Sequence, residues 1–176
     1  MGSNIKWHLG LCRFCLVILN IFGLSLSARA STAPDGNLRK WDVGVTMTAF
    51  SMEDQHGNKI AVGDQVKYVV VAHDMDGSKL ASASFEGVEQ SKFNDRGIVY
   101  LADISGMPGL IAKFVAIPKM QEYPYAVMLD RGGFVKAHAP VKDKQLLLMK
   151  VNQLKIESLQ YFSDPQEMRN LLFGNG

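Results

Sequence analysis

The segment Tyr68-Val-Val-Val-Ala72 constrains the fold of this chain more than any other feature. It is a continuous, largely β-branched run with no polar residue at alternate positions. A strand that faces water on one side alternates apolar and polar residues, so an unbroken run indicates a strand covered on both faces. The sequence therefore predicts a central strand at 68–72 with a layer of structure on each side.

Strand and helix patterns alternate along the rest of the chain. The predicted elements are strands at 45–52, 59–62 and 68–72, a helix at 77–93, a strand at 97–102, a helix at 107–117, hairpins of 125–129 with 134–137 and of 146–151 with 154–162, and a helix after Asp164. This order is typical of a mixed α/β domain. We expect strand 68–72 to lie between strands 97–102 and 125–129.

The last predicted helix has the clearest boundary. Asp164 is a typical N-cap residue, and Pro165 suits the first helical position, where a missing N–H has no cost. The residues predicted to face the core are Met168, Leu171 and Leu172.

The first 30 residues resemble a secretory signal peptide. Lys6 and Arg13 are positive, the apolar stretch 16–26 is short for a membrane span, and Ala28-Arg-Ala30 has the small residues of a cleavage site. We expect cleavage after Ala30, a periplasmic or secreted location, a flexible leader at 31–44, and one domain at 45–176. The alternative is that the segment is retained as an N-terminal anchor.

Both cysteines, Cys12 and Cys15, lie inside this segment, so residues 31–176 contain no thiol. Disulfide exchange, thiol peroxidase chemistry and thiolate–metal ligation all require a thiolate. These activities are therefore excluded for the exported chain.

The charge of the exported chain is close to neutral. All 17 acidic residues lie in 31–176, but 3 of the 19 basic residues lie in the first 30. Nucleic-acid binding needs a basic surface that such a balance does not indicate. We expect neither a nucleic-acid partner nor membrane binding after cleavage.

Three segments resemble the thioredoxin-like superfamily, in particular its peroxiredoxin and thiol-reductase branch. Phe50-Ser-Met-Glu-Asp-Gln-His-Gly57 is similar to the opening hairpin of that group, and Val69-Val-Val-Ala72 to the strand before its redox motif. Tyr123-Pro-Tyr-Ala-Val-Met-Leu-Asp-Arg-Gly132 is similar to its Y-P-x-x-x-x-I-D-x-x-G segment. The resemblance covers 45–140 and implies a thioredoxin-like three-layer α/β/α domain with a central mixed sheet. The hairpin at 144–162 is interpreted as a C-terminal addition.

The resemblance also implies a site. The segment that aligns with the family's Cys-x-x-Cys-Lys motif reads Met75-Asp76-Gly77-Ser78-Lys79, and neither Met75 nor Ser78 can replace a thiolate. A helix N-terminus beside a proline segment could still bind a ligand. The residues of this predicted binding site are Met75, Asp76, Gly77, Ser78, Tyr123 and Pro124.

The expected function is a non-redox binding or accessory role toward an extended peptide or a protein. The family places a cis-proline beside the loop that precedes the first helix. We therefore predict a cis Tyr123–Pro124 bond that leaves main-chain groups free for the peptide.

A second family gives the alternative function. Val69-Val-Val-Ala-His-Asp74-Met-Asp76-Gly resembles the first motif of haloacid-dehalogenase-type phosphatases. That resemblance implies Asp74 as nucleophile and Asp76 as general acid/base, with Mg²⁺. No downstream segment resembles the late acidic pair of that family.

Histidine and aspartate also occur together in this region. His73 with Asp74 and Asp76 could bind a divalent metal, but isolated histidines are more often surface or hydrogen-bonded residues. A helix cap at Asp76 or Ser78 explains the polar residues as well. No metal and no cofactor is expected.

Overall fold

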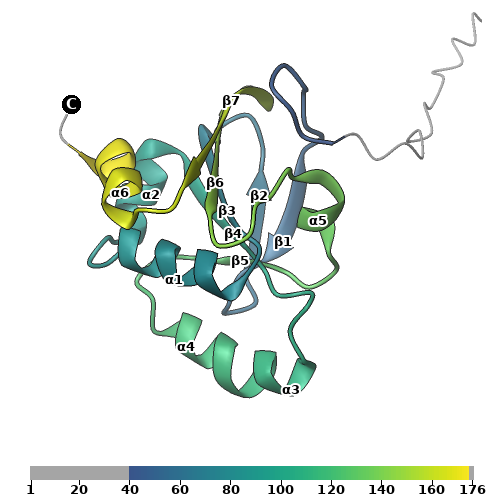
Figure 1. Cartoon of the computed structure of the whole chain (residues 1–176), viewed down its shortest axis with the longest axis vertical. Helices are drawn as coiled ribbons and strands as arrows, with labels where there is room; N and C mark the ends of the chain where they lie inside the picture. Colours follow the sequence, from purple (N-terminus) through teal and green to yellow (C-terminus); the bar gives the residue numbers. More distant parts are fainter. Residues whose placement is uncertain (1–39, 175–176) are drawn as a thin grey trace, which may run out of the picture. The chain divides into compact units, whose positions relative to one another are not determined.

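The computed structural model describes residues 40–174. The predicted signal peptide and residues 31–39 of the predicted leader lie outside the described residues. The main sheet has five strands in the order β5-β4-β3-β6-β7 (Figure 1). They are β3 (Tyr68–Ala72), β4 (Ile98–Asp103), β5 (Met128–Asp130), β6 (Leu146–Asn152) and β7 (Lys155–Phe162).

The run at 68–72 is the central strand, as predicted. β3 pairs in parallel with β4 and antiparallel with β6. Its side chains alternate between two cores: Val70 and Ala72 lie in one, and Val69 and Val71 lie in the other. The strand is apolar throughout because both of its faces are covered.

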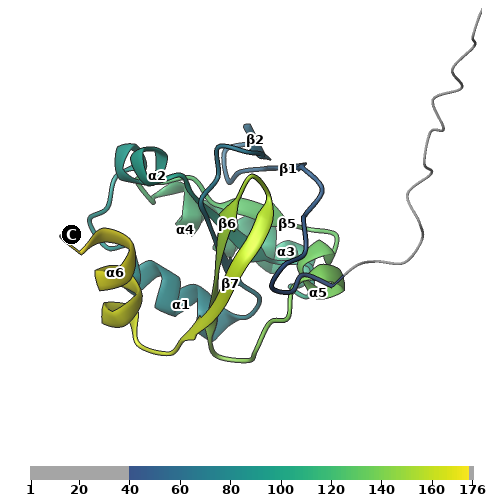
Figure 2. The same cartoon turned by 90° about the horizontal axis from the view of Figure 1, so that it is seen from above.

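Helices cover one face of the sheet (Figure 2). They are α1 (Met75–Ser84), α2 (Gln90–Arg96) and α6 (Pro165–Phe173). Phe85, at the end of α1, is fully buried among the rings of Phe93, Tyr100, Tyr125 and Phe173, with centroid distances of 5.1–6.0 Å. This aromatic cluster joins the three helices to the sheet.

The other face is covered by the hairpin of β1 (Phe50–Glu53) and β2 (Lys59–Val62), by α5 (Phe134–His138) and by the chain before β1. Trp41 is buried against Phe50 and Phe134, and its backbone N donates to His138 O at 2.8 Å. The prediction that 31–44 is a flexible leader is therefore wrong for 41–44, because the Trp41 ring belongs to the core. The first strand is also shorter than the predicted 45–52, since only 50–53 pair with β2.

The predicted helix at 77–93 is two helices. α1 starts at Met75 because Asp74 caps it, and it ends at Ser84, with Phe85 as its C-cap. Gly87 follows with a φ of +69°, a conformation that suits glycine and that no helix can contain. α2 then begins at Gln90.

The predicted hairpin of 125–129 with 134–137 is wrong. β5 is an edge strand parallel to β4, and 134–138 form α5. The cause is the buried carboxylate of Asp130, which accepts hydrogen bonds from Gly132 N at 3.0 Å and Val135 N at 2.7 Å. These bonds fold the chain back into a helical turn and prevent a return strand.

The hairpin of β6 and β7 is present where the sequence predicts it, but it is not an addition to the sheet. β6 occupies the position beside β3 that we expected for 125–129, so the hairpin completes the central sheet. α6 is confirmed with its Asp164 cap, which accepts from Gln166 N at 2.8 Å. Met168 and Leu172 are buried as predicted, whereas Leu171 is exposed.

The predicted helix at 107–117 is observed from 109 to 121 with an irregular middle. It consists of α3 (Gly109–Ile111), the π-helical turn η1 (Ala112–Ala116) and α4 (Ile117–Gln121). Pro118 has no N–H for the carbonyl four residues back, and Ile117 N donates to Ala112 O, five residues back. This segment runs below α1 in Figure 1. No helix within residues 40–174 has the length and apolar character needed to cross a bilayer.

Candidate functional site

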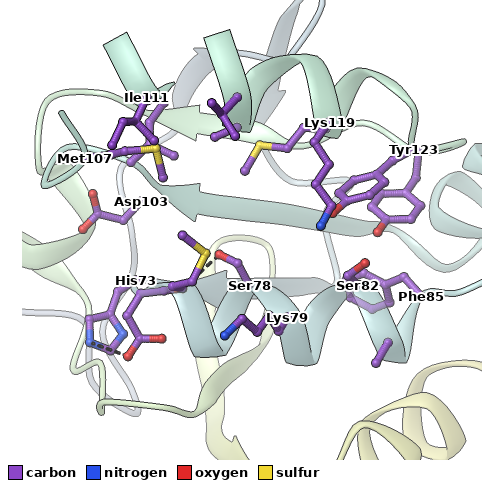
Figure 3. A pocket seen from close by; sticks show the side chains of 18 of the residues that line it. His73, Ser78, Lys79, Ser82, Phe85, Asp103, Met107, Ile111, Lys119 and Tyr123 are labelled. Carbon is purple, nitrogen blue, oxygen red and sulfur yellow. Dashed lines mark hydrogen bonds and ion pairs between the residues drawn. The ribbon is translucent and has the colours of Figure 1, made fainter. Parts of the chain in front are cut away.

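A groove with a volume of about 1060 Å³ lies between α1 and the segment 109–121. Figure 3 shows Met107, Ile111, Lys119 and Tyr123 on one wall and Ser78 and Ser82 on the other. The groove lies at the carboxyl ends of the parallel strands β3 and β4, where α/β sheets commonly bind ligands. It is the first candidate for a functional site.

Asp74 fixes the start of α1 at one end of this groove. Its Oδ1 accepts from Gly77 N at 2.6 Å, and its Oδ2 accepts from Lys144 N at 2.7 Å. Partial burial alone would raise the pKa of Asp74, but these hydrogen bonds lower the pKa below the ordinary value of 3.8. Asp74 is thus an ionised helix cap that also holds the loop before β6.

The residues that the structure describes give no support to the phosphatase alternative. Both carboxylate oxygens of Asp74 are occupied by main-chain donors. Asp76 lies outside the groove and pairs with Lys79 at 3.0 Å on the surface. The two carboxylates are therefore not directed toward one reaction centre.

The Tyr123–Pro124 bond is trans, because residues 40–174 contain no cis peptide bond. The cis prediction is wrong. Tyr123 and Pro124 precede the edge strand β5, whereas the antiparallel neighbour of β3 is β6. The chain that faces the start of α1 is the segment before β6, where Gln145 O would lie 3.2 Å from a Cβ at Gly77. The alignment of Met75 and Ser78 with a lost redox motif therefore has no support from Pro124.

The main chain of 124–127 is not free for a peptide either. Pro124 O accepts from Gln90 N at 3.0 Å, and Ala126 N donates to Gln90 Oε1 at 2.6 Å. The buried Gln55 accepts from Val127 N at 2.7 Å and donates to Tyr125 O at 2.8 Å. A ligand at this wall must be recognised by side chains.

Tyrosines form the inner part of the groove. Tyr123 and Tyr125 stack at 5.2 Å, and both line the groove. Burial raises the pKa of Tyr125 and of Tyr100 beneath it, with a smaller opposing effect of the Ser78 hydroxyl on Tyr100. The Tyr125 phenol at the groove therefore stays neutral at physiological pH and offers hydrogen bonds rather than charge.

Three side chains at the mouth of the groove could hold a divalent metal. His73 Nε2 lies 3.0 Å from Asp143 Oδ1 and 3.8 Å from Asp74 Oδ2. The third member differs from the sequence interpretation, which had Asp76 in place of Asp143. His73 Nε2 is paired with Asp143, whereas the buried His73 Nδ1 has no hydrogen-bond partner within the described residues. Asp74 is held by its two main-chain donors.

Asp103 lines the same end of the groove from the end of β4. Its side chain is buried, and its Oδ1 accepts from the backbone N and the hydroxyl of Ser105 at 2.8 and 2.6 Å. Its Oδ2 has no hydrogen-bond partner and lies 3.9 Å from Lys136 Nζ. This carboxylate shapes the turn after β4.

The structure brings four of the six predicted binding residues to the groove: Met75, Ser78, Tyr123 and Pro124. Asp76 and Gly77 do not line it. Met107, Ile111, Val115 and Lys119 also line the groove, but the sequence pattern predicted only a helix at 107–117 and gave these residues no role. The absence of any acidic residue in 104–121 was a signal that could have marked the segment as a surface with its own role.

The sequence matches no family model and no curated protein. Solved structures do match. A candidate protein disulfide isomerase from Bacteroides thetaiotaomicron superimposes with a TM-score of 0.51 at 16% identity, over 74% of this chain and 86% of that one. A candidate thiol:disulfide interchange protein, DsbE, from Chlorobium tepidum gives 0.51 at 18% identity, over 75% and 94%. At these identities the likeness concerns the fold, and the sheet order and covering layers agree with it. This chain therefore has a thioredoxin-like fold.

Proposed function

We propose that this chain is an exported, thiol-free binding protein that holds a partner polypeptide in the groove between α1 and the segment 109–121. The proposal rests on the groove itself. The exposed apolar side chains of Met75, Ile111 and Val115 line it together with polar groups. Ligand sites in proteins are typically concave and mostly apolar with a few polar groups.

The non-redox character rests on the sequence. Residues 16–176 contain no cysteine, so a cleaved chain has no nucleophilic sulfur. The residues at the start of α1 serve as helix cap and loop anchor instead. Export rests on the signal-peptide pattern of residues 1–30.

Export and the lack of redox activity can be tested together. The full chain should be expressed in a bacterium, and the N-terminus of the exported product should begin at Ser31. That product should not accelerate the reduction of insulin by dithiothreitol. An uncleaved chain, or acceleration of insulin reduction, would contradict these two parts of the proposal.

Binding in the groove can be tested without a known partner. Peptides selected from a random phage library against the purified protein should lose affinity when Ala83, which lines the groove from α1, is replaced by tryptophan. Lys92→Trp, on the exposed surface of α2, is the matched control and should bind as the wild type does. If no selected peptide distinguishes the two variants, the groove is not the binding site.

A further inference from the structure

The segment 109–121 exposes its largest apolar side chains. Leu110, Ile111, Phe114 and Val115 are 47–74% exposed, in two pairs that lie about one helical turn apart. Met75 is 58% exposed and lines the groove on the opposite wall. These five are most of the seven large apolar residues exposed within residues 40–174. Met75, Ile111 and Val115 line the groove, whereas Leu110 and Phe114 lie on the same segment outside its lining. Single exposed apolar residues are ordinary, but four on one short segment indicate an interaction surface.

The groove is lined by charges of both signs: Lys79, Lys119 and Lys136, and Asp74, Glu86 and Asp103. Asp74 and Asp103 accept hydrogen bonds from the chain, and Lys79 and Lys136 lie near Asp76 and Asp103. The segment that carries four of the five exposed apolar residues has charges of one sign. Residues 104–121 contain Lys113 and Lys119 and no acidic residue. Within the described part of the chain, neither lysine forms an ion pair. Figure 3 shows Lys119 directed into the groove beside Tyr123. An occupant with carboxylates next to its apolar residues would complement both features.

The walls of the groove determine how an occupant can be recognised. Both walls are helices, whose backbone groups bond within each helix, and the main chain at 124–127 is bonded to Gln55 and Gln90. An extended peptide that adds to a protein needs a free sheet edge for its backbone bonds, whereas a helix satisfies its own. The groove therefore suits a helix that is read by side chains alone.

We infer that the groove binds an acidic amphipathic helix of a partner protein. The helix would insert large apolar residues spaced i, i+3 or i+4 and i+7 between Met75 and the Ile111–Val115 pair. Its flanking Asp or Glu residues would pair with Lys113 and Lys119. This inference rests on the proposed binding function and names the chemistry of the partner.

Two other occupants are disfavoured. An anionic membrane is flat and cannot fill a concave groove, and two lysines supply only about 1 kcal/mol each of attraction to such a surface. A second copy of this chain would have to present a complementary acidic apolar helix. The one exposed apolar residue on α6, Leu171, stands alone there, so the described surface offers no such helix.

The test uses peptides selected from a random 16-residue phage library against the wild-type protein. We expect the enriched peptides to share the i, i+3/i+4, i+7 apolar spacing with acidic residues beside it. Circular dichroism of the best peptide should show helix forming on binding. Enriched peptides that bind in an extended form at the groove would overturn this inference and leave the proposed binding function intact.

A charge swap makes the test specific. The double variant Lys113→Glu/Lys119→Glu should weaken binding of the acidic peptide by about tenfold or more. When the acidic residues of the peptide are replaced by lysine, this basic peptide should bind the double variant more tightly than the acidic peptide does. Lys59→Glu/Lys92→Glu has the same net charge on exposed positions elsewhere, and it should leave binding unchanged. An equal loss of affinity for the acidic peptide in both double variants would overturn the inference.

The other occupants give distinct results with the variant Phe114→Ser. Binding of the wild type to phosphatidylglycerol vesicles, lost in Phe114→Ser, would assign the surface to a membrane and overturn the inference. A dimer in analytical ultracentrifugation, lost in the same variant, would assign it to a second copy. A wild-type protein that is monomeric and does not bind the vesicles would agree with the inference. Phe114 is exposed, so the variant should fold as the wild type does.

Discussion

Replacing Asp74 with alanine should destabilise the domain, because this carboxylate ties two separate segments together. It caps α1 through Gly77 N and holds the loop before β6 through Lys144 N. Loss of an N-cap costs about 1 kcal/mol. A hydrogen bond to a charged group contributes about 1.5–3 kcal/mol, and we take less than the lower value because 28% of the side chain is exposed.

We therefore expect Asp74→Ala to lower the free energy of unfolding by about 2 kcal/mol. Asp74→Asn should cost about half as much, since its amide oxygen still accepts from Gly77 N while its NH₂ group cannot accept from Lys144 N. The assay is urea unfolding followed by circular dichroism. Asp76→Ala is the matched control: it breaks only an exposed pair with Lys79 and should cost about 0.5 kcal/mol or less.

The effect should also depend on pH. The pKa of Asp74 is below 3.8 in the folded protein, so its ionisation stabilises the fold above that pH. This contribution is lost as the pH falls through the folded-state pKa. The difference in the free energy of unfolding between the wild type and Asp74→Asn should be largest at pH 7 and smaller at pH 3. If Asp74→Ala costs no more than Asp76→Ala, or if the difference grows on acidification, the cap argument is refuted.

Three further predictions use the same unfolding assay. Phe85→Ala should lower the free energy of unfolding by about 3–5 kcal/mol, because the ring is fully buried in the aromatic cluster. Phe114→Ala, at an exposed position, should change that free energy by less than about 0.5 kcal/mol. Similar losses in the two variants would contradict the assigned burial. Gln153 has a φ of +46° in the β6–β7 turn, a backbone conformation that asparagine adopts more readily than glutamine. Gln153→Asn should therefore raise the free energy of unfolding by about 0.5 kcal/mol, and a decrease would argue against this turn. Dithiothreitol should not shift the unfolding midpoint of residues 31–176, which lack cysteine; a shift in the exported product would mean that Cys12 and Cys15 are retained and paired.

The central strands could be predicted from the sequence because their signals are local. The apolar run 68–72, the turn between 151 and 155, and the Asp164-Pro165 cap each depend on residues within one short segment. The neighbour of β3 could not be predicted in the same way. Segments 125–129 and 146–151 are both apolar, and only the packing of the whole domain places β6 beside β3 and β5 at the edge.

The site was partly predictable for the same reason. Met75 and Ser78 follow the central strand directly, so their position at the groove follows from the strand assignment. The opposite wall was missed because helical spacing shows that one side of 109–121 is apolar but does not show whether that side is buried. Ala112 and Met120 are buried, while Phe114 and Val115 are exposed.

The aspartates at the ends of the three parallel strands explain why binding, rather than chemistry, is the function to test. Catalytic groups of α/β proteins commonly lie at these strand ends. Here Asp74 caps α1, Asp103 holds the turn at Ser105, and Asp130 holds the start of α5. Each carboxylate thus accepts hydrogen bonds that order the chain after its own strand. Of the Asp74 and Asp103 oxygens at the groove, only Asp103 Oδ2 accepts no hydrogen bond, and it lies 3.9 Å from Lys136 Nζ. What the described residues leave available at this end of the sheet is an apolar groove with two unpaired lysines beside it, which can select a partner by shape and charge.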